Sequence, residues 1–234
     1  MRIDSHIKDY YSYDVDSFLA LPALQYRLTY LFVDIDLLNA SIFWITNKER
    51  IKYNLPQFKY HKKLNEMATI QSNQMRIHNF FAHENPFDAK YRTLSDRVNA
   101  VKDGHFSGFY CFAENIADVP IIMANVCFFT EQRQGVTRFV RDNGTEVLPY
   151  TYIEYANTVV DAWMNSPRHR ANILNLDYVY LGCGCAKYEK KEPNYSMLYF
   201  KLTQNFGGEE LFDPIQYGIS GIKKTIQIIK KKLG

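Results

Sequence analysis

The residues best suited to acid–base or metal chemistry in this sequence are two histidines and one glutamate: His83, Glu114 and His169. Glu114 stands among apolar neighbours in the segment 110–117, whose composition predicts a largely buried strand. An ionised carboxylate in such a place needs a partner. Two kinds of partner fit the sequence: a histidine or bound cation, or an arginine such as Arg97.

His169 follows a clear helix-start signal. Ser166 is a good N-cap residue and the proline after it is favoured at the first helical position, so a short helix is expected over 167–174. In the first turn of that helix the dipole disfavours a protonated imidazole, and a neutral imidazole can bind a metal or accept a proton. A surface or hydrogen-bonded structural role is the alternative for each histidine. His78 and His83 lack the i, i+4 spacing of a zinc protease, and no HExxH motif occurs.

The hydrophobic pattern predicts alternating helices and short strands. Apolar residues recur at helical spacing over 35–54, 64–79 and 152–165, and a further short helix is consistent with 94–101. Strands are expected at 57–60, 110–117, 179–186 and 197–206, with a charged hairpin separator at 188–195. Extra strands or a hairpin are expected within 118–150, which contains the turn signal Asp142-Asn143-Gly144.

Composition and charge narrow the class of protein. With 234 residues, 47% hydrophobic and 23% charged, the chain resembles an ordinary soluble globular protein with a sizeable core. The net charge is only +3, and no Lys/Arg run interleaved with aromatic residues appears in the body of the chain. The sequence therefore predicts no nucleic-acid partner.

The four cysteines are too few for a disulfide scaffold. Cys183 and Cys185 are two apart in a predicted strand and should share a face. Free buried thiols are the main expectation, with a Cys111–Cys127 or cross-strand disulfide as the alternative in an oxidising compartment.

The two ends of the chain differ in character. No secretory signal is visible, because the first residues are acidic and lack a basic start with an apolar run. The apolar segment 18–33 is interrupted by Pro22 and is too short to span a bilayer, so a docked helix or internal hydrophobic segment is expected. The segment 222–233 predicts a short basic amphipathic helix, either docked on the body or in weak contact with an anionic membrane.

Six short motifs, taken in order, resemble the bacterial SCP-like branch of the CAP superfamily, which comprises cysteine-rich secretory proteins, antigen 5 and pathogenesis-related proteins. The resemblance covers about residues 36–207. The motifs are Asn47-Lys48-Glu49-Arg50 with Leu55-Pro56, the helix from Leu64 to Met75, Phe80-Phe81-Ala82-His83, Glu114-Asn115-Ile116-Ala117, Trp163 to Arg170, and the closing pair Leu181-Gly182-Cys183-Gly184 and Thr203-Gln204-Asn205-Phe206.

The resemblance implies an α+β fold, a three-layer α-β-α sandwich around a small, mainly antiparallel sheet. It implies a domain over 35–210 with an insertion at about 118–150, preceded by an extension over 1–34 and followed by the basic tail over 211–234. It also implies a cleft in which His83, Glu114 and His169 converge, with Ser166, Arg170 and Gln204 in support. In the family such a site can hold a divalent cation such as zinc, with His83 and His169 as its ligands here.

The sequence departs from the family pattern at three places. Ser166 stands where many eukaryotic members have a second glutamate, the segment 118–150 is longer than usual in bacterial members, and most relatives are secreted whereas this chain shows no signal peptide. The shortened donor set favours a module that binds a lipid, glycan or peptide over an enzyme. A zinc-assisted hydrolase with Glu114 as general base, and an interaction role for the insertion, are the alternatives.

Overall fold

The computed structural model describes residues 9–101, 106, 108–122, 129–133, 136–192 and 195–209. Its main sheet has four strands in the order β1-β5-β6-β2. β2 and β5 each run antiparallel to β6, and β1 pairs with β5 in parallel. The strands are β1 (Lys59–Tyr60), β2 (Phe109–Pro120), β5 (Tyr180–Glu192) and β6 (Tyr195–Glu209).

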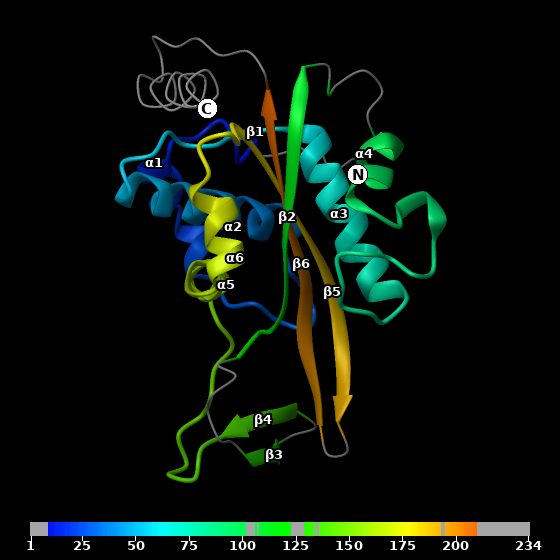
Figure 1. Ribbon diagram of the computed structural model, residues 1–234. Helices are drawn as coiled ribbons and strands as arrows, with labels where there is room; N and C mark the ends of the chain where they lie inside the picture. The colour runs from blue at the N-terminus through cyan, green and yellow to red at the C-terminus, as the bar shows by residue number, and fades with distance from the viewer. Residues whose placement is uncertain are drawn as a thin grey trace, which may run out of the picture.

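Helices cover both faces of this sheet (Figure 1). One face carries α1 (Val15–Leu19), α2 (Ile35–Lys52), α5 (Tyr152–Asn165) and α6 (Pro167–Leu174), and the other carries α3 (Lys62–Ile77) and α4 (Leu94–Val101). The fold is therefore the expected α+β, three-layer α-β-α sandwich with a mainly antiparallel sheet.

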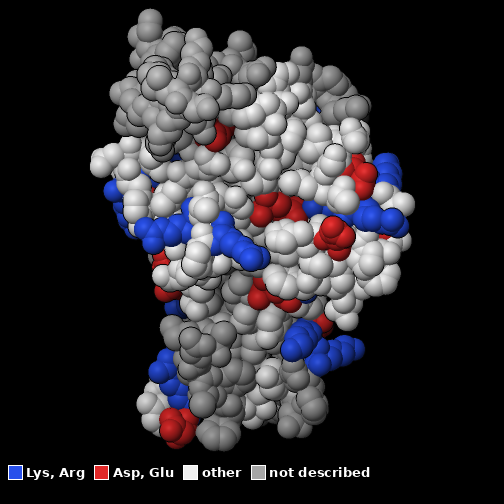
Figure 2. All heavy atoms as spheres, in the orientation of Figure 1, with Lys and Arg blue, Asp and Glu red and all other residues white. Residues whose placement is uncertain are grey.

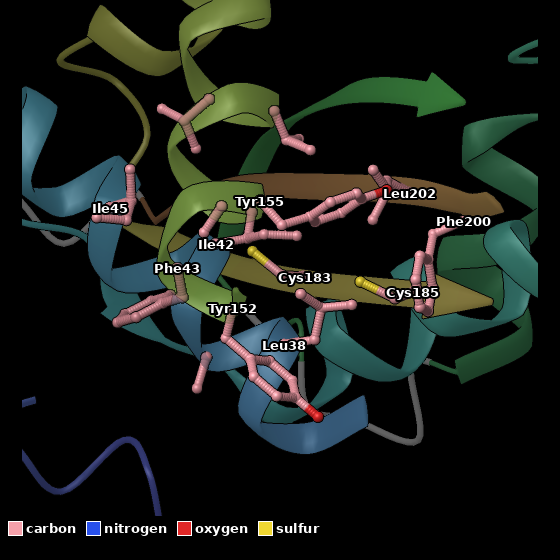
Figure 3. Close-up of a cluster of buried hydrophobic side chains, with 14 of the residues drawn as sticks. Leu38, Ile42, Phe43, Ile45, Tyr152, Tyr155, Cys183, Cys185, Phe200 and Leu202 are labelled. Atoms are coloured by element: carbon pink, nitrogen blue, oxygen red, sulfur yellow. The ribbon is translucent and has the colours of Figure 1, made fainter. Parts of the chain in front are cut away.

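The main core lies between the sheet and the layer formed by α2 and α5. Tyr155 of α5 and Phe200 and Leu202 of β6 are completely buried there. Figure 3 shows side chains from the helices α2 and α5 and the strands β5 and β6 meeting in this cluster, with the sulfurs of Cys183 and Cys185 among them. These two cysteines share a face as predicted, and both are free thiols. Cys111 is also free, and Cys127 lies outside the described residues.

Helix α3 lies unusually close to β5. A Cβ atom added to Gly182 would come within 2.0 Å of the Asn65 amide nitrogen, and one added to Gly184 within 2.3 Å of the Thr69 amide nitrogen. These two glycines are needed because they let backbone meet backbone. The contact fixes the position of α3, and with it the start of the loop that carries His83.

The segment 18–33 is internal only in part: Leu28 is fully buried, whereas Leu31 and Phe32 are 97% and 73% exposed. Pro22 separates the short α1 from a 3₁₀ turn, η1 (Pro22–Gln25), and Phe18 and Leu24 between them become fully buried in the main core. No helix among the described residues is long and apolar enough to cross a membrane. The predicted basic helix at 222–233 lies outside the described residues.

Within the segment 118–150, β3 (Phe129–Arg133) and β4 (Val136–Val140) form a small second sheet, which lies near the ends of β5 and β6 (Figure 1). The Asp142-Asn143-Gly144 signal marks a turn, closed by a hydrogen bond from the Gly144 amide to the Arg141 carbonyl.

Local capping explains why the helix boundaries agree with prediction. Thr151 and Glu154 form a capping box that starts α5, and α5 and α6 have the predicted limits. Ser166 is the N-cap of α6 as predicted, although its hydroxyl makes no capping hydrogen bond. One detail was wrong. The separator expected at 188–195 is mostly strand, because the pairing of β5 with β6 continues to Glu192 opposite Tyr195.

Candidate functional site

Glu114 is the buried centre of the site. Its side chain is only 3% exposed, and it projects from β2 at one edge of the sheet. One carboxylate oxygen, Oε1, lies 2.9 Å from His83 Nδ1, and the other, Oε2, lies 2.8 Å from Arg97 Nη2. Both partners considered from the sequence, a histidine and Arg97, are therefore present together.

Arg97 ties this carboxylate to the surrounding loops. It comes from α4, is completely buried, and donates from Nη1 to the Tyr91 carbonyl at 3.0 Å and from Nη2 to the His83 carbonyl at 3.1 Å. In the orientation that satisfies both ends of its amide, Asn205 places its nitrogen 3.2 Å from Glu114 Oε2. The negative charge is thus compensated by one cation and several hydrogen bonds, as a buried carboxylate requires.

His83 is held by its backbone and by Glu114 but remains open to solvent. The side chain is 54% exposed. Gln71 of α3 donates to the Ala82 carbonyl at 2.8 Å, which fixes the segment just before it. In the neutral tautomer that donates from Nδ1 to the carboxylate, Nε2 has a lone pair for a ligand, the arrangement in which a carboxylate orients a histidine for metal binding.

His169 approaches from α6, on the other side of the sheet from α3. Its carbonyl accepts a hydrogen bond from Asn115 Nδ2 at 3.2 Å, and Asn172 donates to Asn115 Oδ1 at 2.9 Å. Burial lowers the pKa of the His169 imidazole below 6.5, and the charge of nearby His83 lowers it further. A neutral imidazole is as expected, although desolvation rather than the helix dipole is the main cause.

The three residues predicted to support the site have different contacts. Gln204 is buried and links the strand to α2, accepting from Asn115 at 3.2 Å and donating to Thr46 Oγ1 at 2.8 Å. Arg170 instead contacts Tyr53 at the end of α2, with Nη2 3.0 Å from the hydroxyl. Ser166 starts α6 and so sets the position of His169.

Sequence reasoning named one amide of this site, Gln204, and did not single out four others. Asn115, Asn172, Asn205 and Gln71 each hold a strand, helix or loop in place, yet buried amides follow no periodic pattern that would have identified them. Asn115 and Asn205 appeared only as members of the motifs quoted above.

The donor set falls short of a resident zinc centre. Structural zinc normally has four protein ligands and catalytic zinc three. Within the described part of the chain, no group of three or more His, Cys, Asp or Glu side chains is placed to hold a metal ion. His83 and His169 could supply two nitrogen ligands, and Glu114 is engaged by its own partners.

The lowered pKa of His169 predicts how the stability of the folded protein depends on pH. Because its pKa in the folded state lies below the unfolded value, the unfolded chain binds more protons between the two values, and the contribution of this residue to stability falls as the pH drops through that window. We expect an NMR titration of the His169 ring to give a pKa below 6.5. The change His83→Gln should raise it, since the second cause disappears. A His169 pKa at or above 6.5 in the unmodified protein would contradict the assignment.

Comparison with known proteins supplies the family. The model of the cysteine-rich secretory protein family, CAP, matches residues 45–200. A curated relative, the "uncharacterized membrane protein YlbC" of Bacillus subtilis (strain 168), is 28% identical over 144 residues, which cover 62% of this chain and 30% of that protein. This chain therefore spans less than a third of that relative's length.

Two solved structures are also similar. An extracellular protein containing an SCP domain from Bacillus anthracis str. Ames is 25% identical with a TM-score of 0.46, covering 74% of this chain and 40% of that one. An outer surface protein from Borrelia burgdorferi is 18% identical with a TM-score of 0.46, covering 76% of this chain and 97% of that one. The family match extends over two thirds of the sequence and includes both histidine motifs and the Glu114 strand, so this chain belongs to the CAP family.

Proposed function

We propose that the chain is a ligand-binding module whose cleft, lined by His83 and His169, takes a lipid, glycan or peptide, with a divalent cation as a weakly held co-ligand. The observation that carries this proposal is the difference in exposure between Glu114 and the histidine that it contacts. The carboxylate is buried with both oxygens engaged, whereas the imidazole it orients is more than half exposed. The site thus presents to solvent an imidazole whose orientation is fixed by the carboxylate.

The same geometry supports binding over hydrolysis. A general base must reach a water molecule beside the substrate. Glu114 Oε1 faces His83 and Oε2 faces Arg97, so the carboxylate is used to hold these two residues. A role as a positioning residue fits this better than the role of general base in a zinc-assisted hydrolase.

Surface charge is consistent with a small or peptide ligand. Acidic and basic side chains are interspersed over the described part of the face in Figure 2, without one broad field of a single sign. A broad basic field is the electrostatic footprint of nucleic-acid binders, and its absence from this face agrees with the low net charge of +3.

Zinc titration tests the two histidines as a pair. We expect calorimetry at neutral pH to detect weak zinc binding to the full chain, and the double change His83→Ala with His169→Ala to abolish it. The matched control is His78→Ala, because His78 ends α3 and stacks on Phe87 with ring centroids 5.0 Å apart. Unchanged zinc affinity in the double variant would contradict the assignment of His83 and His169 as cation ligands.

A further inference from the structure

A second polar depression lies between α2 and α3, and it shares no residue with the cleft of His83, Glu114 and His169. Its volume is about 480 Å³, within the range of small-molecule sites. Four amide side chains line it, and we call it the amide groove: Asn39, Asn65, Asn73 and Gln74.

Helix periodicity builds most of the groove. From Asn65 to Gln74, α3 contributes pairs of adjacent residues that recur every four positions, so they form two rows along one face of the helix. Nine steps of ~1.5 Å make this wall about 13 Å long. The first turns of α2 form the facing wall, with Asp36 and Asn39, and Tyr91 joins from the 3₁₀ turn η2 (Ala89–Tyr91).

Asn39 supplies an independent sign that the groove takes a ligand. The residue is only 3% exposed, and its Oδ1 has no hydrogen-bond partner among the described residues. A buried polar atom is normally paired, since an unmade hydrogen bond there is costly. Oδ1 itself is enclosed, so a ligand hydroxyl would supply the missing donor once the Asn39 side chain turns toward the groove.

The chemistry of the lining selects against anions. Among the described residues, no lysine or arginine lines the groove, whereas Asp36 and Glu66 do. Glu66 is paired with Lys63, Nζ to Oε2 2.9 Å, and no described cation lies within ion-pair distance of Asp36. A metal ion is also poorly served, because the described residues hold no group of three metal-ligating side chains.

We propose that the amide groove binds a short neutral oligosaccharide. The oxygens of Asn65 and Gln74 already accept hydrogen bonds from Tyr11 and Asn85, but their amide nitrogens have no acceptor among the described residues and can donate to sugar hydroxyls. The Tyr91 ring and the Ile70 side chain, which also line the groove, offer apolar surface to the carbon–hydrogen faces of sugar rings. The elongated wall on α3 suits a linear chain of rings.

NMR of the full chain with defined sugars tests the proposal. The probes are the neutral trisaccharides cellotriose, maltotriose, mannotriose and chitotriose at millimolar concentration, with anionic trigalacturonate for comparison. We expect at least one neutral probe to shift the amide resonances of Asn65, Thr69 and Asn73 while leaving those around His83 in place. Trigalacturonate should bind at least about threefold more weakly, because two carboxylates line the groove.

The matched variants are Asn73→Ala and Asn157→Ala. Both asparagines donate from Nδ2 to the carbonyl one turn earlier in their own helix, to Thr69 at 3.1 Å and to Ile153 at 2.8 Å, but only Asn73 lines the groove. Alanine favours helix, so both variants should fold. We expect Asn73→Ala to weaken the binding of the neutral sugar about three- to tenfold and Asn157→Ala to leave it unchanged.

Three results would overturn the proposal. They are the absence of shifts at the groove with every neutral trisaccharide, equal affinity in the two variants, or tighter binding of trigalacturonate. Shifts confined to residues around His83 would place sugar binding in the other cleft, which would favour the function proposed above and refute this one.

Discussion

Replacing Arg97 by methionine should lower the free energy of unfolding by about 3–5 kcal/mol, the cost of leaving one member of a buried ion pair without its partner. Arg97 is completely buried, and its Nη2 lies 2.8 Å from Glu114 Oε2. Methionine fills much of the volume but donates no hydrogen bond, so the carboxylate and the carbonyls of Tyr91 and His83 lose a donor. Urea denaturation followed by circular dichroism measures the change.

Two controls separate the charge from the packing. Arg138→Met removes an arginine that binds Glu146 through two hydrogen bonds at the surface, and it should cost at most about 1 kcal/mol. Adding Glu114→Gln to Arg97→Met should recover part of the loss, because no uncompensated charge then remains. Equal costs for Arg97→Met and Arg138→Met would show that the buried ion pair does not hold the site together.

The change Gly184→Ala should cost about 3 kcal/mol, at the upper end of typical overpacking penalties. The new Cβ would lie 2.3 Å from the Thr69 nitrogen and 2.4 Å from the Ala68 carbonyl carbon, and both are backbone atoms that cannot rotate away. Helix α3 would have to move outward, which would also weaken the 2.9 Å hydrogen bond from Ser72 Oγ to the Gly184 carbonyl. Thermal and urea denaturation report the loss.

The control for this substitution is Gly144→Asn. Gly144 has a φ of +79°, which asparagine tolerates better than most residues, and nothing lies within 4 Å of an added Cβ. We expect its cost to stay below about 1 kcal/mol. If Gly184→Ala were as mild, α3 would not be fixed by contact with the strand backbone, and its link to the His83 loop through Gln71 would lose its structural basis.

Local signals explain which parts of the fold were predictable. The limits of α5 and α6 follow from the Thr151 capping box and the Ser166-Pro167 pair, which act within one helical turn. The far end of β5 could not be predicted, because residues 187–192 are mostly polar and carry no hydrophobic alternation. Backbone pairing with β6 alone makes them a strand.

The candidate site also combines features that local sequence predicts with features that depend on tertiary packing. A carboxylate in an apolar strand needs a partner for its charge, and Glu114 could be singled out for that reason. The choice between His83 and Arg97 depends on how α4 and the loop after α3 meet β2, which no local pattern records. The structure makes the choice unnecessary, because each partner binds a different carboxylate oxygen.

The position of β2 at the edge of the sheet has a mechanical consequence. His83 follows α3 on one face and contacts Glu114 of β2, and His169 belongs to α6 on the other face, where its carbonyl accepts a hydrogen bond from Asn115 of β2. A ligand that touches both histidines would link the three layers of the fold. Its release would then be coupled to any small separation of those layers, and a bound ligand would slow the opening of the whole domain.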